Sequence, residues 1–185
     1  VFIPHYFTTA LWLAQRTIVS FWGIVVSMAI INITQVTNKR LLRIGEIIAC
    51  ISLLVNISYI YKITSDNISI SRTDQEVAYT IEQEIQKYEN ETGNLITKIA
   101  VHNDSVPAYT YSFVKYCNHD MNVRALCTSW SALNSINYYN GTAYEEIGMT
   151  DEEYNQIFGE NRNWNVLDLS EQMYFDGDIL YLAIY

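Results

Sequence analysis

Hydrophobic and polar positions divide the chain into an apolar beginning and a patterned remainder. The stretch from Ile18 to Val36 carries no charge over nineteen residues. That is about the length an α-helix needs to cross a hydrocarbon core of roughly 30 Å. A second apolar run, Ile44 to Ile63, holds Glu46 near one end and two tyrosines near the other. The two runs predict transmembrane helices at about residues 18–36 and 44–62.

The residues between the two runs are basic. "NKRLLR", residues 38–43, holds three positive charges, and basic residues in short loops stay on the cytoplasmic side of a membrane. The sequence therefore predicts a cytoplasmic loop at 37–43, a multi-pass protein of the cell membrane, and an extracytoplasmic C-terminal domain. Asn32, Ser52 and Asn56 make the runs more polar than a lone anchor, which favours packing against other helices. A soluble helical hairpin is the alternative interpretation.

The balance of charge changes sign near residues 63–67. Residues 1–65 hold five Lys and Arg against one Glu, whereas the later residues hold six against nineteen Asp and Glu. This change predicts a membrane region at 1–64 and a separate domain at 65–185. The acidic domain would repel nucleic acid and anionic lipid, so neither is expected as its partner. The chain starts with valine and shows no signal-peptide pattern, so we expect a C-terminal piece of a longer protein.

The acidic half alternates helix and strand patterns. Thr73 and Glu76 have the spacing of a capping box, which predicts a helix start, and Gly93 is placed to end that helix. Residues 95–101 read as a buried strand, and residues 107–117 fit either a strand or a short helix. The later elements expected are a helix at Ser129–Tyr139 with Trp130, Leu133 and Ile136 inward, a capped helix from Thr150 to Gly159, and a hairpin turning at Asp176-Gly177.

These patterns together predict a fold class. Two transmembrane α-helices are followed by a small extracytoplasmic α+β or α/β domain, with about three or four strands and three helices.

The densest side-chain chemistry lies in "NVRALCTSWSALNSINYYNG", residues 122–141. Trp130, Tyr138 and Tyr139 have the ring faces on which a sugar stacks, while Arg124 and Asn134 have donors for its hydroxyls. The sequence thus offers these five residues as a ligand-binding set. The alternative is that the same aromatics pack the domain core.

No residue is predicted to be catalytic. The pairs His102 with Asp104 and His119 with Asp120 lie in separate loops without metal-ligand spacing. The chain has no nucleophile elbow, glycine-rich phosphate loop or HExxH motif. We therefore expect solvated loop residues at these positions, and no metal or other cofactor.

The order of segments resembles a known family. Two apolar runs precede "YENETGNLITKIAV", then "RALCTSWSALNSINYYNG", a Trp in "NRNWN" and a terminal "EQMYFDGDILYLAIY". This order is similar to the C-terminal part of bacterial Gtr-type glucosyltransferases, which are polytopic membrane proteins of GT-C-like architecture. The resemblance covers most of residues 44–185 and includes no catalytic signature.

The resemblance implies a membrane glucosyltransferase. Its donor would be polyprenyl-phosphate-linked glucose in the lipid bilayer, and its acceptor a surface polysaccharide such as O-antigen or cell-wall glycan. The catalytic carboxylates of such enzymes lie in early loops, which would precede this chain, so residues 65–185 would form an accessory domain that positions the acceptor. The alternative is a two-span membrane protein without enzymatic activity, whose outer domain binds or senses a ligand.

Overall fold

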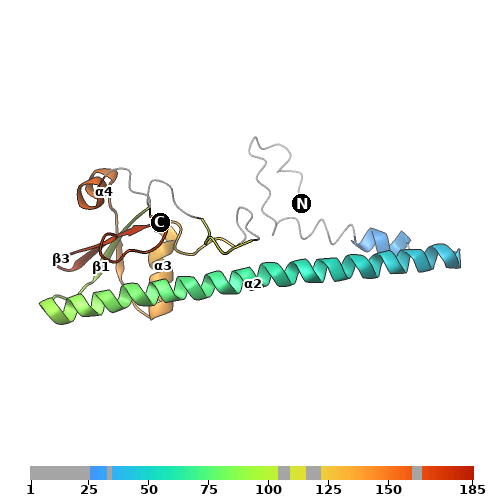
Figure 1. Cartoon of the computed structure of the whole chain (residues 1–185), viewed down its shortest axis with the longest axis horizontal. Helices are drawn as coiled ribbons and strands as arrows, with labels where there is room; N and C mark the ends of the chain where they lie inside the picture. Colours follow the sequence, from blue (N-terminus) through green and yellow to red (C-terminus); the bar gives the residue numbers. More distant parts are fainter. Residues whose placement is uncertain (1–25, 33–34, 104–108, 116–121, 160–163) are drawn as a thin grey trace. The chain divides into compact units, whose positions relative to one another are not determined.

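The longest element of the protein is the helix α2, which runs unbroken from Lys39 to Thr92 (Figure 1). The computed structural model describes residues 26–32, 35–103, 109–115, 122–159 and 164–185. Asn38 starts α2, because its side-chain oxygen accepts hydrogen bonds from the backbone N–H groups of Arg40 and Leu41. The loop predicted at 37–43 is therefore too long, since the helix begins inside it.

The first half of α2 is long and apolar enough to cross a membrane. All side chains from Glu46 to Lys62 are exposed, and the predicted span at 44–62 lies wholly within this helix. Of the span predicted at 18–36, residues 26–32 are helical, while residues 18–25 and 33–34 lie outside the described part of the chain. The structure thus shows one helix of membrane-spanning character among the described residues, and the prediction of two is not shown.

The second half of α2 belongs to a compact unit formed by residues 66–115 and 122–185. The prediction of a helix start at Thr73 is wrong. Thr73 lies in the interior of α2 and donates its hydroxyl to the carbonyl oxygen of Ser69, one turn earlier. The helix ends at Thr92, before Gly93, as expected. Its buried face consists of Ile70, Asp74, Ala78, Ile81 and Ile85.

A four-stranded mixed sheet forms the centre of this compact unit, with the strand order β2-β1-β4-β3. β1 pairs in parallel with both β2 and β4, and β3 pairs antiparallel with β4. The hairpin prediction is confirmed, since Gly177 adopts a positive φ of 60° in the turn between β3 and β4. The strands are β1 Lys98–Asn103, β2 Glu145–Ile147, β3 Met173–Asp176 and β4 Ile179–Ile184.

Helices cover both faces of the sheet. α2 and the helix α3, Ser129–Asn140, pack on one face and share a core with alternate residues of β1 and β4 (Figure 1). The helix α4, Asp151–Phe158, packs on the other face through Tyr154 and Phe158. The small α/β domain expected from the sequence is present, with four strands.

Two local predictions need correction, and one strand was not predicted. The strand expected at 95–101 instead occupies Lys98–Asn103. Residues 109–115, expected as a strand or short helix, form turns and bends. The strand β2 has no counterpart among the predictions, because its three residues include two exposed glutamates and show no apolar run.

The start of α4 supplies a first test of the fold. Thr150 and Glu153 form the predicted capping box, in which each side chain accepts a hydrogen bond from the other residue's backbone N–H. We expect Thr150→Ala to lower the free energy of unfolding by about 1 kcal/mol. Urea unfolding of the full chain would measure this loss. Gln156→Ala, a change at an exposed position of the same helix, is the control and should leave stability unchanged.

Candidate functional site

An exposed row of side chains runs along α3. Trp130, Asn134 and Tyr138 are spaced four residues apart, which places them on one face of a helix. Trp130 is 72% exposed and Tyr138 is 82% exposed, whereas Leu133 and Ile136 are buried against the sheet. At 1.5 Å per residue, the Cα atoms of Trp130 and Tyr138 lie about 12 Å apart along the helix axis. We call these three residues the α3 row.

The inward position predicted for Trp130 is therefore wrong, while those predicted for Leu133 and Ile136 are confirmed. The small residue Ala132, which is fully buried, occupies the sheet-facing position in the first turn instead. A methyl side chain lets the helix backbone approach the sheet closely, and this turns Trp130 toward solvent.

The polar member of the row is held within the helix. The Asn134 side chain donates from Nδ2 to the carbonyl oxygen of Trp130 at 3.0 Å. This bond uses one of the two N–H groups of the amide and directs the amide nitrogen toward the preceding turn of the helix, where the Trp130 carbonyl lies. The row therefore presents an aromatic ring, an oriented amide and a second aromatic ring in sequence.

Tyr139 lies beside the row and is partly buried. Its ring meets that of Tyr138 edge-on at a centroid distance of 5.4 Å, and its hydroxyl lies 3.4 Å from Oγ of Ser71 on α2. Tyr139 also packs against the main core cluster. Its ring packs between Tyr138 and the core. Less of its surface is therefore exposed to a ligand than that of Trp130 or Tyr138.

Arg124 is separated from the other residues of the predicted set. It is only 2% exposed, and its Nη1 donates to the main-chain oxygen of Tyr185 at 2.8 Å. The guanidinium carbon lies 4.5 Å from the ring centroid of Tyr111 and 3.9 Å from that of Tyr185. Such cation–π contacts are strongest where water is excluded. The structure gives Arg124 a place in the interior, where it holds Tyr185, the residue that follows β4, to the loop that contains Tyr111.

Asp74 completes this interior group. It is buried on α2 and accepts hydrogen bonds from the Tyr111 hydroxyl at 2.7 Å and from the backbone N–H of Ala125 at 2.8 Å. Burial raises the pKa of the Asp74 carboxyl, against the opposing effects of these hydrogen bonds and the charge of Arg124. Burial and the neighbouring Asp74 carboxylate raise the pKa of Tyr111. We call Asp74, Tyr111, Arg124 and Tyr185 the Arg124 cluster.

Asp74 has no counterpart among the predicted site residues, although a signal was present. Ile70, Ala78, Ile81 and Ile85 define the buried face of α2, and Asp74 lies four residues from both Ile70 and Ala78. A carboxylate at a core position of a helix predicts a buried partner. Tyr111 and Ala125, the groups that donate to it, come from loops far away in the sequence and lack any such pattern.

His102 lies at the carboxyl end of β1 and contacts α4. Its Nε2 is 2.8 Å from Oδ1 of Asp151, its Nδ1 is 2.6 Å from the carbonyl oxygen of Asn103, and its ring stacks on Tyr154. These contacts attach β1 to the first turn of α4. Within the described ranges, no group of three or more His, Cys, Asp or Glu side chains is placed to hold a metal ion. The other members of the two predicted pairs, at positions 104, 119 and 120, lie outside the described residues.

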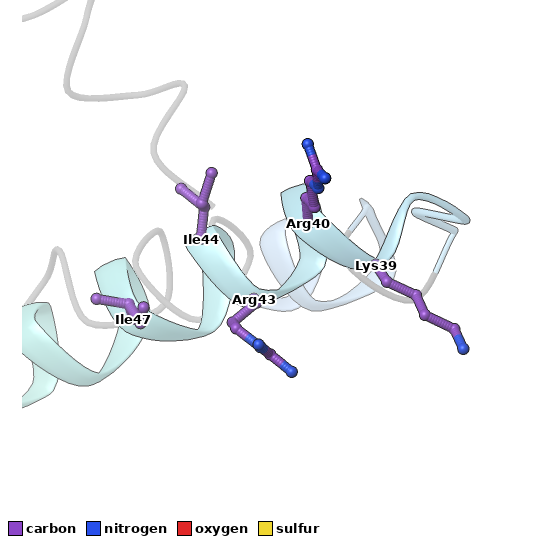
Figure 2. Close-up of a pocket in the computed structure, with 5 residues that line it drawn as sticks. All are labelled: Lys39, Arg40, Arg43, Ile44 and Ile47. Atoms are coloured by element: carbon purple, nitrogen blue, oxygen red, sulfur yellow. The ribbon is translucent and has the colours of Figure 1, made fainter.

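A hollow beside the first turns of α2 is lined by two kinds of side chain. Figure 2 shows Arg40 and Ile44 projecting from one side of the helix and Lys39 and Arg43 from the other; Ile47 also lines the hollow. Cations in the first turn oppose the helix dipole, which favours negative charge at an N-terminus. Their position is therefore better explained by the apolar segment that follows them than by helix stability.

Comparisons with protein-family models, with curated proteins and with solved structures find no match to this chain.

Proposed function

We propose that this chain is the C-terminal part of a membrane glucosyltransferase, and that residues 66–185 form an accessory domain which holds the polysaccharide acceptor. The donor in this proposal is polyprenyl-phosphate-linked glucose, and the acceptor is a cell-surface polysaccharide. The order of segments, similar to that of Gtr-type enzymes, supports the reaction class. The α3 row is the observation that carries the glycan-binding role.

The chemistry of the α3 row suits a neutral sugar chain. The faces of aromatic rings accept the apolar C–H surface of a pyranose, and amides bond its hydroxyls. Trp130 and Tyr138, exposed on one helix face, leave two aromatic rings open to a ligand. Residues after position 65 hold nineteen acidic against six basic side chains, which disfavours anionic ligands.

The apolar half of α2 supports the membrane part of the proposal. Its exposed side chains from Glu46 to Lys62 would be costly in water, and the basic residues at its start belong on the cytoplasmic side of a membrane. In this topology α2 runs outward through the bilayer, a multi-pass membrane region precedes the domain, and the domain is extracytoplasmic.

A binding test addresses the role of the α3 row. In the membrane-embedded protein, Trp130→Ala should weaken binding of the acceptor polysaccharide about tenfold, since central aromatic contacts are worth more than 1 kcal/mol and 1.4 kcal/mol is a factor of ten. Isothermal titration with purified polysaccharide would measure the change. Tyr109→Ala removes a 60% exposed aromatic outside the row and is the matched control.

Glucose transfer by the native protein gives the second readout. Trp130→Ala and Tyr138→Ala should each raise the acceptor KM and leave the use of the lipid-linked donor unchanged. Unchanged polysaccharide affinity in both variants, with the fold intact, would remove the acceptor role from the α3 row.

A ligand-sensing domain without enzymatic activity is the second candidate. It is favoured by one observation, which is that α2 remains helical without a break through residues 63–67. Native protein that binds glycan through the α3 row but transfers no glucose from the lipid donor would favour this candidate over the enzyme.

A further inference from the structure

Three cations lie at the start of α2. Lys39, Arg40 and Arg43 form no ion pair and no side-chain hydrogen bond with any residue that the structure describes. The first turn of the helix contains no acidic residue. Lys39 and Arg43 are four residues apart, where like charges repel each other across one helical turn. The start of α2 is thus short of negative charge, and a bound anion would supply it.

The side chains of these cations line one hollow together with two isoleucines, Ile44 and Ile47 (Figure 2). The volume of the hollow is about 390 Å³, which lies within the range of about 300–1,000 Å³ found for small-molecule sites. Glu46, the nearest acid along α2, is not among the residues that line it. The hollow therefore has room for a ligand, and its charged side chains are all positive.

The hollow has a charged end and an apolar end. At 1.5 Å per residue, Lys39 to Arg43 cover about 6 Å of the helix axis, and Ile47 lies about 6 Å beyond Arg43. Ile44 and Ile47 are each more than half exposed, and residues 47–61 carry no charge. A phospholipid has the same order, with a phosphate at the membrane surface and acyl chains below it.

The chemistry of the charged end selects an anionic headgroup. The guanidinium groups of Arg40 and Arg43 can each donate two hydrogen bonds to phosphate oxygens, and the Lys39 ammonium adds a point charge. Basic clusters at the cytoplasmic end of a membrane-spanning helix attract the anionic lipids of that leaflet. The acidic residues after position 65 have the opposite charge and would repel the same lipids.

We propose that the hollow at residues 39–47 binds the headgroup of an anionic phospholipid in the cytoplasmic leaflet. The two arginines hold the phosphate, the lysine strengthens the attraction, and the two isoleucines contact the first part of an acyl chain. The inference rests on the membrane setting of the proposed function, and it adds a lipid partner for the start of α2.

Lipid titration of the full chain in detergent micelles tests this site, with bound lipid counted by native mass spectrometry. The chain should bind phosphatidylserine in preference to phosphatidylcholine. Arg40→Gln combined with Arg43→Gln should weaken phosphatidylserine binding about twenty-five-fold, because each basic residue near an anionic lipid contributes about a factor of five. The matched control, Arg72→Gln with Lys87→Gln, removes two exposed cations from the later part of α2 and should leave this affinity unchanged.

Three outcomes would overturn the lipid site. Equal affinity for the two lipids would mean that the cations do not select an anionic headgroup. Equal losses in the two double variants would mean that net charge, and not this hollow, attracts the lipid. Displacement of phosphatidylserine by an equal concentration of inorganic phosphate would mean that the hollow binds a free anion. Alkaline carbonate extraction of native membranes decides separately whether the chain is embedded, so failure of the membrane setting is distinguishable from failure of the lipid site.

Discussion

Asp74→Ala is expected to lower the free energy of unfolding of the compact unit by about 2–4 kcal/mol, because it leaves one buried and one part-buried donor unsatisfied. The Tyr111 hydroxyl and the Ala125 backbone N–H both donate to this carboxylate. Its loss also removes the negative charge that lies near the buried guanidinium of Arg124. Urea unfolding of the full chain in detergent, followed by near-ultraviolet circular dichroism, would measure the loss.

The control for this prediction lies two residues away. Glu76 is an exposed acid on the same helix, and Glu76→Ala removes the same charge without breaking a buried contact. Its effect should stay within about 0.5 kcal/mol. If the two variants lose equal stability, the Arg124 cluster does not hold the unit together in the way described.

Ile85→Ala is expected to cost about 3 kcal/mol, since it opens a cavity in the main core. Ile85 is fully buried, and it belongs to the cluster that joins α2 and α3 to the sheet. Leu54→Ala removes a similar aliphatic side chain from the same helix, but at a 68% exposed position in the apolar half. The same unfolding measurement should show almost no change for Leu54→Ala.

Together the two variants test whether α2 has a buried core face around Ile85 and an exposed apolar face around Leu54 that does not stabilise the compact unit. A large loss for Leu54→Ala in the unfolding of the compact unit would contradict that division. A small loss for Ile85→Ala would contradict the assignment of its core face.

Local rules in the sequence predicted those elements whose ends are determined by local contacts. The capping box at Thr150, the glycine after α2 and the hairpin at Gly177 each depend on a few neighbouring residues. The same type of rule failed at Thr73. There the pattern of a capping box competes with continued i→i−4 hydrogen bonding, and a helix already formed upstream favours continuation.

The geometry of the candidate site could not be predicted from local sequence rules, because it depends on tertiary contacts. Hydrophobicity alone predicted Trp130 inward, because it assigns the most weight to the largest apolar side chain. The sheet instead receives Ala132, since close approach of α3 depends on small volume. Arg124 has the sequence character of a ligand contact, and only its neighbours Tyr111 and Tyr185 place it in the interior.

The position of β4 has a consequence for the order in which the domain is made. β4 lies between β1 and β3, and it pairs in parallel with β1 across a sequence separation of about eighty residues, as in the pairing of Lys98 with Ile179. During synthesis β1 must therefore wait, with one side unpaired, until residues 179–184 emerge. Contacts of such long range fold slowly, and an unpaired strand edge attracts other chains in the meantime. The domain is thus expected to need β4 before the middle of its sheet is protected, which makes the interval before β4 is synthesised the stage at which a chaperone would be most useful.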